Sequence, residues 1–255
     1  MKTGNPRPVP LPLAAASALF FCAAAFIVRF PHIPGASVGS YVSTFLIALP
    51  PCAALFRYLG ARRAVVSLIA LSAFAYAIET TGVVTGFPYG EFRYGDSLGP
   101  KALGLVPYLL PVSYAPLVLG AVAAAPLRRL VPRVLVSAVL LVVTDAVLDP
   151  GAVALGFWTY LNGGSYYGVP ASNFAGWLLS GTLAAAILLV LGGGWRSAPP
   201  PGLLDGLVIA AAFWSGAAVF SGLPLPALVG FVLFAYLLYR RSRLAGSPAP
   251  RPGRV

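Results

Sequence analysis

The chain has 255 residues, of which 59% are hydrophobic and 9% are charged, and its net charge is +11. A soluble domain has about a quarter charged residues and roughly 45–50% apolar ones, so the composition excludes a soluble globular enzyme, a disordered chain and a nucleic-acid-binding module. The positive charge comes from 17 basic residues against only six acidic ones. In so apolar a chain, basic residues mark the edges of membrane spans, and we interpret the protein as integral to a lipid bilayer.

Eight apolar segments approach the length of about 20 residues that a helix needs to cross a bilayer. In chain order they are 11–29, 39–57, 64–84, 104–125, 133–150, 173–192, 203–221 and 224–240. The first follows two basic residues, as a signal peptide does, but the seven apolar segments after it favour a retained helix. We predict an all-α bundle of about eight transmembrane helices, which forms a single polytopic membrane domain over residues 1–243. Residues 244–255, rich in Pro, Gly, Ser and Arg, are predicted to be a disordered cytoplasmic tail.

The basic residues also predict the orientation of the bundle. With the N-terminus inside, the outer segments contain only Arg29, Arg93 and Lys101, and all other basic residues fall on the inner side. This asymmetry obeys the positive-inside rule for an even number of helices. We therefore expect both termini to be cytoplasmic in a multi-pass protein of a prokaryotic cell membrane.

Residues with metal or redox chemistry are rare. Cys22 and Cys52 both lie in apolar segments and form no disulfide framework, and His32 is the only histidine. Zinc sites need more such ligands than this chain offers, and a catalytic triad also needs a histidine near its nucleophile. We therefore predict no metal site and expect carboxylates and tyrosines to carry the chemistry.

Three acidic residues fall inside predicted spans, where a charge is costly and is usually functional. Glu79 lies near the outer end of the third span, and Asp145 and Asp149 lie near the outer end of the fifth. The i, i+4 spacing of the two aspartates places them on one helix face. We favour a functional role for Glu79 and Asp145. Asp149 precedes Pro150. This acid could therefore mark the end of a helix, and we weigh this structural role equally with a functional one.

The other three acids have simpler interpretations. Glu91 and Asp96 lie in the outer loop after the third span, with Arg93 between them, and we predict a solvated cluster there. Asp205 begins the seventh span, where an acid complements the helix N-terminus, and we predict a structural role for it.

Aromatic residues gather around the two long outer loops. Around the first loop they are Tyr89, Phe92, Tyr94, Tyr108 and Tyr114, and around the second they are Trp158, Tyr160, Tyr166, Tyr167 and Trp177. An interfacial belt of aromatic residues explains any single ring, but a belt forms at both membrane surfaces. The imbalance between the two sides favours a long unsaturated or isoprenoid substrate that lies against these rings.

These residues fall in segments that resemble a known membrane family. In the first half of the chain the segments are Glu79-Thr-Thr-Gly82, Gly86-Phe-Pro-Tyr-Gly-Glu-Phe-Arg-Tyr94, Leu98-Gly99 and Pro107. In the second half they are Asp145-Ala-Val-Leu-Asp149-Pro150, Trp158, Tyr166-Tyr-Gly-Val-Pro170, Asn173 and Gly176-Trp177. The chain resembles the CruF-type carotenoid hydratases, which include the bisanhydrobacterioruberin hydratases. The resemblance covers roughly residues 60–200, and the Tyr-Tyr-Gly-Val-Pro-x-x-Asn segment is its most specific part.

The resemblance implies addition of water across the terminal carbon–carbon double bond of an acyclic carotenoid, which gives a tertiary alcohol. The implied partners are the carotenoid, water and the lipid bilayer, with other carotenoid-pathway membrane enzymes as candidates and no nucleic acid. No cofactor is implied. Substrates of the C40 and C50 classes both remain open.

Such a hydration proceeds by protonation of the alkene to a tertiary carbocation, which water then captures. We expect catalysis by the three intramembrane acids, with Asp145 or Glu79 as proton donor and Asp149 as the group that stabilises the cation and orients water. Two carboxyl groups close together take up different protonation states, so one is an acid and the other an anion. The expected substrate-binding residues are Tyr89, Tyr94, Trp158, Tyr166, Tyr167, Asn173 and Trp177. Among these, the rings of Trp158, Tyr166 and Tyr167 offer π faces to the cation, and Asn173 and Tyr94 are candidates for holding the water.

Two other functions stay open. Asp145-x-x-x-Asp149 is similar to the magnesium-binding aspartates of intramembrane prenyltransferases, although those enzymes have two such motifs with basic residues nearby. A transporter with the outer acids as a proton or cation relay is the other alternative. A prenyltransferase would depend on magnesium, whereas a hydratase would not. A transporter would move its substrate across a membrane without changing it chemically.

Overall fold

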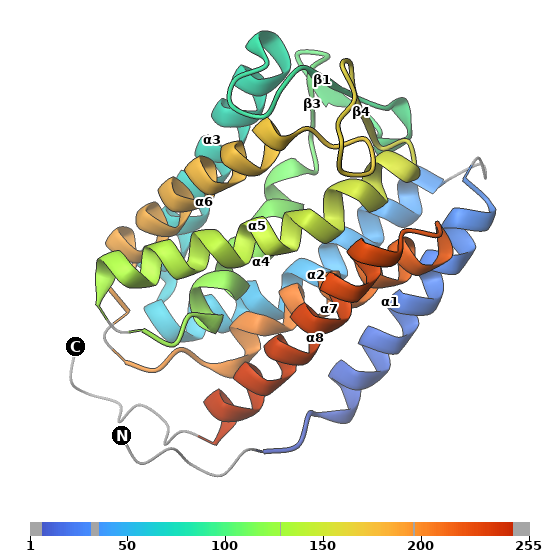
Figure 1. The fold of residues 1–255 in the computed structure, drawn as a ribbon. Helices are drawn as coiled ribbons and strands as arrows, with labels where there is room; N and C mark the ends of the chain where they lie inside the picture. The colour runs from blue at the N-terminus through green and yellow to red at the C-terminus, as the bar shows by residue number, and fades with distance from the viewer. Residues whose placement is uncertain (1–6, 32–35, 128, 196, 247–255) are drawn as a thin grey trace.

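The computed structural model describes residues 7–31, 36–127, 129–195 and 197–246. The fold is a bundle of helices, as predicted (Figure 1). The helices are α1 (Leu11–Arg29), α2 (Ala36–Leu59), α3 (Ala61–Thr85), α4 (Leu110–Ala124), α5 (Leu130–Ala154), α6 (Ala171–Leu191), α7 (Asp205–Phe220) and α8 (Pro224–Ala245). Within the described ranges, seven helical segments are long and apolar enough to cross a membrane. One of them, Pro201–Phe220, joins the 3₁₀ helix η2 (Pro201–Leu204) to α7, and α4 is shorter. His32 and residues 247–255 of the predicted tail lie outside the described residues.

The fourth predicted span is only partly helical. Its first residues form the short antiparallel strands β2 (Lys101–Ala102) and β3 (Val106–Pro107), and α4 begins at Leu110. A helix of 15 residues is about 22 Å long, which is less than the bilayer core of about 30 Å. The helix avoids lipid because α2, α3, α5, α6 and α7 surround it, and every residue from Tyr114 to Ala124 is buried.

Small residues hold the helices around α7 together. A β-carbon at Gly216 would lie 2.6 Å from the carbonyl oxygen of Phe21 on α1, and one at Gly206 would lie 2.8 Å from that of Ile47 on α2. A β-carbon at Gly120 of α4 would overlap the side chain of Leu207. Membrane helices associate through such close backbone approaches because lipid gives them no hydrophobic driving force. The helix α7 is therefore the element against which α1, α2 and α4 are packed.

The two ends of the bundle differ in charge. The described ends of the chain lie at the same end of the bundle (Figure 1), together with the turns between α2 and α3, α4 and α5, and α6 and α7. We call it the basic end because of its arginines, which are Arg57, Arg62, Arg63, Arg129, Arg133, Arg240, Arg241 and Arg243. Asp205 is the first residue of α7, and its carboxylate accepts a hydrogen bond of 2.6 Å from Arg241 Nε on α8. This ion pair joins the last two helices.

The opposite end, which we call the loop end, contains residues 86–109 and 155–170. Two strands that the sequence analysis did not predict, β1 (Phe92–Tyr94) and β4 (Trp158–Tyr160), pair there in antiparallel register. Phe92 is paired with Tyr160 and Tyr94 with Trp158, while the pair between them, Arg93 and Thr159, is exposed. Side chains alternate between the faces of a strand. The sheet therefore turns four aromatic rings toward the bundle and its polar pair outward.

The close approach of α4 to α7 generates a prediction about stability. We expect Gly120→Ala to lower the free energy of unfolding by about 1–3 kcal/mol, since overpacking a tight site costs that much. Denaturant unfolding of the purified protein in detergent micelles measures the change.

The matched control is Gly39→Ala on α2, where an added β-carbon meets nothing within 4 Å. Alanine is favoured over glycine in a helix by up to about 1 kcal/mol, so the control is expected to match or exceed the wild type. Equal stability of the two variants would contradict the packing argument.

Candidate active site

The three intramembrane acids lie together at the loop-end half of the bundle. Glu79 lies on α3, and Asp145 and Asp149 lie one turn apart on α5. Their exposed fractions are 7%, 0% and 2% respectively. Burying carboxyl groups so completely is costly unless each has a hydrogen-bond partner, and the structure supplies those partners from other segments.

Asn173 on α6 joins the two aspartates. Its Nδ2 atom donates hydrogen bonds to Asp145 Oδ2 at 2.7 Å and to Asp149 Oδ2 at 2.8 Å. An amide nitrogen carries two hydrogens, so both bonds form at once. The second oxygen of Asp145, Oδ1, is buried and has no hydrogen-bond partner among the described residues. The two carboxyl groups therefore share one donor in a site without water-exposed surface.

The sheet at the loop end contributes two phenol groups. Tyr160 donates a hydrogen bond to Asp149 Oδ2 at 2.5 Å, and Tyr94 donates one to Glu79 Oε2 at 2.8 Å. Burial and the neighbouring Glu79 hold the pKa of Tyr94 well above the usual range of a tyrosine, and burial and Asp149 do the same for the pKa of Tyr160. Both phenols therefore keep their protons and act as fixed donors at neutral pH.

Tyr89 anchors the first loop between α3 and α6. Its ring is 2% exposed and lies against Gly82 of α3 and Gly176 of α6. A β-carbon at Gly176 would lie 2.6 Å from the Tyr89 ring, and one at Gly82 would lie 2.9 Å from it. The two glycines thus provide the space in which the ring is seated, and Trp177 packs beside it with 6.5 Å between ring centroids.

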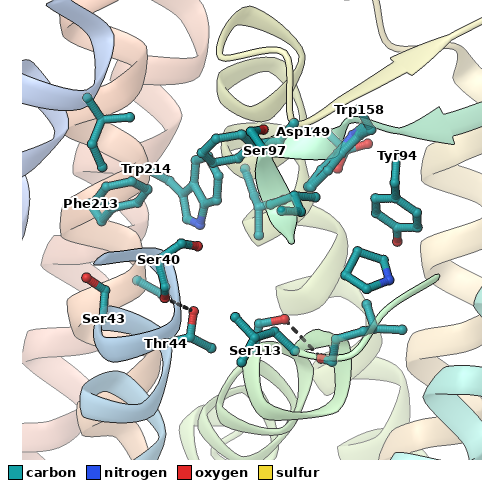
Figure 2. A pocket seen from close by; sticks show the side chains of 18 of the residues that line it. Ser40, Ser43, Thr44, Tyr94, Ser97, Ser113, Asp149, Trp158, Phe213 and Trp214 are labelled. Carbon is teal, nitrogen blue, oxygen red and sulfur yellow. Dashed lines mark hydrogen bonds between the residues drawn. The ribbon is translucent and has the colours of Figure 1, made fainter. Parts of the chain in front are cut away.

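These groups face an apolar cavity of about 530 Å³. From the acid side its lining includes Glu79, Asp149, Asn173, Tyr94, Tyr160, Trp158, Tyr89, Tyr114 and Trp177. Helices α1, α2, α4 and α7 contribute most of the remaining wall. Figure 2 shows Ser40, Ser43 and Thr44 on α2 across from Tyr94 and Trp158. No Lys or Arg of the described ranges lines this space.

The predicted site residues divide into two groups. Seven of the ten line the cavity, namely Glu79, Asp149, Tyr89, Tyr94, Trp158, Asn173 and Trp177. Asp145 is behind Asp149 and does not line it. Tyr166 and Tyr167 are also outside it, since their rings stack edge to face at 5.2 Å and the Tyr166 hydroxyl bonds the carbonyl of Ala146 on α5. Tyr167 lies inside the tight turn between Tyr166 and Val169, at a positive φ of 51°, and Tyr166 contacts α5 beside Asp145 without entering the cavity.

Several residues of the site were not predicted from the sequence. Tyr160 was counted only as an aromatic residue near the second loop, and the cavity walls from α1, α2 and α7 were not expected. The alternation of aromatic and polar residues in Phe92-Arg93-Tyr94 and Trp158-Thr159-Tyr160 was the signal for two strands. Each segment is only three residues long, which made that signal weak.

The charged residues of the loop after α3 lie apart from this cavity. Glu91, Arg93 and Asp96 are exposed, as expected for a solvated cluster. Asp96 forms an ion pair of 2.8 Å with Lys101, which lowers the pKa of its carboxyl group. Of the six acids, two therefore lie on the exposed loop surface, three lie in the buried site beneath the sheet, and Asp205 lies at the basic end.

Comparisons of the sequence with known proteins identify the family of the chain. Residues 35–237 match the family described as "Carotenoid biosynthesis protein". The chain is 43% identical over 190 residues to the bisanhydrobacterioruberin hydratase of Haloarcula japonica, and the match covers 69% of this chain and 63% of the relative. The chain thus spans less than two thirds of that relative's length. No solved structure matches the chain.

The family match covers most of the chain and includes all three buried acids, Asn173 and both strands of the sheet above them. With its seven helices of membrane-spanning length, the chain is a multi-pass membrane protein that belongs to the carotenoid biosynthesis protein family.

Proposed function

We propose that the protein adds water to the terminal carbon–carbon double bond of an acyclic carotenoid and so forms a tertiary alcohol. The observation that carries the proposal is the pair Glu79 and Asp149, two carboxyl groups that face one apolar cavity and are each held by a phenol. An apolar cavity suits a hydrocarbon end group, and acid–base hydration needs one group to give a proton and another to take one. The name of the Haloarcula japonica relative supports the same reaction.

The reaction balances with these two acids and one water. A carboxylic acid gives its proton to the CH carbon of the terminal double bond, which leaves a tertiary carbocation on the neighbouring carbon. The water oxygen bonds to that cation, and a carboxylate takes the proton that water loses. The net change is the addition of one water, and a proton passed between the two acids restores the starting state.

The hydrogen bonds support one distribution of the two roles between Glu79 and Asp149. Asp149 Oδ2 accepts from both Tyr160 and Asn173, and donated hydrogen bonds stabilise a carboxylate. Glu79 accepts a single side-chain bond, from Tyr94. We therefore assign proton donation to Glu79, and cation stabilisation and proton uptake from water to Asp149.

Asp145 takes a positioning role in this scheme. It does not line the cavity, its Oδ1 atom has no partner in the described part of the chain, and its Oδ2 atom shares Asn173 with Asp149. Two negative charges that share one donor in an apolar site repel each other strongly. A proton on Asp145 removes that repulsion and leaves the single negative charge on Asp149, where the carbocation forms.

The aromatic lining adds a second source of cation stabilisation. Trp158 packs edge to face on Tyr94 at 5.9 Å, and Trp177 packs against Tyr114 at 6.0 Å. Ring faces attract a cation most strongly in a desolvated site. These rings therefore favour a carbocation over a neutral alkene, which is the difference that lowers a reaction barrier.

Membrane orientation follows from the basic end. By the positive-inside rule, its arginines support an orientation with both chain ends on the cytoplasmic side of a prokaryotic cell membrane. The acids and the sheet then lie in the outer half of the bilayer. The carotenoid dissolves in the same bilayer, so it reaches the enzyme without crossing water.

The first test is the product itself. In a host that makes lycopene, expression of the chain is expected to yield carotenoids heavier by one water, or by two where both ends react, as measured by mass spectrometry. A product extended by an isoprenoid unit in a magnesium-dependent reaction would instead indicate a prenyltransferase. Transport without chemical change in proteoliposomes would indicate a carrier.

Removing either cavity-facing acid is expected to abolish hydration. We predict that Glu79→Gln and Asp149→Asn each reduce product formation by at least about a hundredfold, as general acid–base groups contribute 10²–10⁴-fold. The matched control is Glu91→Gln in the exposed loop, which is expected to leave the rate unchanged. Full activity of both site variants would contradict the mechanism.

Asp145 is predicted to behave differently from Asp149. Asparagine resembles a protonated aspartate in shape and accepts the Asn173 hydrogen bond through its carbonyl oxygen. We therefore expect Asp145→Asn to keep measurable activity and Asp149→Asn to lose it, with turnover of purified enzyme as the measurement. The reverse order would show that Asp145 is the group that reacts.

The hydrogen bonds from the two phenols are predicted to increase the rate of hydration. A hydrogen bond to a charged group contributes about 1.5–3 kcal/mol, and each 1.36 kcal/mol is tenfold in rate. Tyr160→Phe is therefore expected to slow turnover by roughly 10- to 100-fold, and Tyr94→Phe is expected to lower it in the same direction. The control is Tyr108→Phe, an exposed tyrosine outside the cavity lining, and wild-type rates in Tyr160→Phe would exclude this role.

A further inference from the structure

The cavity extends well beyond the acids. Beyond the site already described, its wall includes residues of α1 and the segment just after it, of α2 and of α7. Among them are Ala23 and Phe26 of α1, Phe30 directly after it and Gly39 of α2. These segments play no part in the proton chemistry proposed above. We propose that the space between α1 and α2 is a lateral portal, through which an acyclic isoprenoid chain enters from the bilayer and in which it stays during the reaction.

The packing of the helices leaves this side open. Helix α1 packs along α7, and α2 packs on α4, α3 and α7, whereas the described residues of α1 and α2 have few close backbone contacts with each other. Both helices nevertheless line the same cavity. Among the described residues, close helix packing therefore does not close the cavity wall between α1 and α2.

The cavity reaches the outer surface at this place. Phe26 and Phe30 line the cavity, yet 57% and 50% of their surfaces are exposed. Gly39 on α2 also lines it and is exposed. Ser97 at the loop end and Ser113 on α4 are also exposed residues of the lining, but the large exposed apolar rings among the lining residues are those at the end of α1. The portal therefore has one rim at the end of α1, at Phe26 and Phe30, and the other on α2, at Gly39.

The surroundings of the mouth are apolar. Val42, Phe45 and Leu46 on α2 and Leu19 on α1 are all exposed by half or more. Both helices have membrane-spanning length, so these side chains face lipid. A hydrocarbon chain that leaves the cavity here passes from protein into bilayer without contact with water, whose cost would be about 25 cal/mol for each Å² of apolar surface.

The loop end is a less suitable route. The β1–β4 sheet lies over the acids, with Phe92, Tyr94, Trp158 and Tyr160 all in the cavity lining. Tyr89 fills the space between α3 and α6. A chain entering from that side would have to separate these aromatic residues from their partners.

The cavity is too small to enclose a whole carotenoid, so part of the chain has to extend out of it. A volume of about 530 Å³ is in the usual range for a site that holds a drug-sized ligand. That space suits the end group and the adjoining part of a chain, whereas a carotenoid of forty or more carbons is longer than such a ligand. This step rests on the proposed function, and it places the rest of the polyene in the portal and the bilayer.

The test narrows the portal without altering the acids. Ala23 on α1 is half-buried and lines the cavity, and the matched control Ala18, on the same helix, is exposed and does not line it. We expect Ala23→Trp to lower kcat/KM for a full-length acyclic carotenoid in proteoliposomes by at least about tenfold, and Ala23→Leu to lower it less. Ala18→Trp is expected to match the wild type.

A short substrate separates the portal from the chemistry. A ten-carbon acyclic isoprenoid with the same terminal double bond fits inside the cavity, so Ala23→Leu is expected to hydrate it at the wild-type rate. Equal rates of wild type and both Ala23 variants on the long substrate would overturn the portal. Equal loss on long and short substrates by Ala23→Leu would also overturn it, because the damage would then lie at the acids. A wild type that hydrates neither substrate would overturn the proposed function instead.

The unfolding temperature of each variant, measured in detergent, separates a narrowed portal from a loss of stability. Ala23→Leu adds a smaller side chain than Ala23→Trp, so it carries the comparison if the larger substitution prevents folding. A loss of rate in a variant that unfolds at the wild-type temperature supports the portal. A loss that follows the unfolding temperature, in Ala18→Trp as well as in the Ala23 variants, counts against it.

Discussion

The cost of burying three carboxyl groups in an apolar bundle is the constraint on which the rest of this site depends. A carboxyl group in a membrane interior needs donors, because lipid provides none. Neither α3 nor α5 supplies them. Asp149 is bonded by Tyr160 of β4 and by Asn173 of α6, and Glu79 is bonded by Tyr94 of β1. The acids thus tie the loop end and α6 to the two helices that carry them.

The β1–β4 sheet solves a second polar problem at the same place. Backbone N–H and C=O groups near the membrane also need partners, and the two loops satisfy part of theirs by pairing with each other. Antiparallel pairing then fixes the direction of each side chain. One arrangement therefore satisfies the backbone, turns Tyr94 and Tyr160 onto the acids, and sends Arg93 and Thr159 outward to the surface. The donors of the site are fixed by backbone geometry, and this preorganises them for charge that develops during a reaction.

Hydropathy predicted most of the bundle, because a membrane helix is defined by its length and its apolar composition. The span 11–29 is the helix α1, and the acids of spans three and five meet as their positions at one end implied. Hydropathy could not predict that α4 is short, since residues 104–109 are as apolar as a helix there would be. Nor could the spacing predict which aspartate faces the cavity. The i, i+4 relation places Asp145 and Asp149 on one helix face, but Asp149 lies four residues, or about 6 Å, further along the helix. Only Asp149 reaches the cavity lining. Tyr166 and Tyr167 do not line the cavity, and the tight turn that holds them, with Tyr167 in a left-handed conformation, could not be predicted from composition.

The tight and the open parts of the bundle have a common origin in α7. Its Gly216 brings α1 close, and its Gly206 brings α2 close, so both helices are held by α7 and not by each other. Between these two glycines, Phe213 and Trp214 of α7 line the cavity, and the Trp214 ring also packs on Gly151 of α5. The helix that brings α1 and α2 close through glycine therefore also supplies two large rings to the cavity wall. Small residues at the helix crossings and large ones between them let α7 serve both the packing of the bundle and the shape of the site.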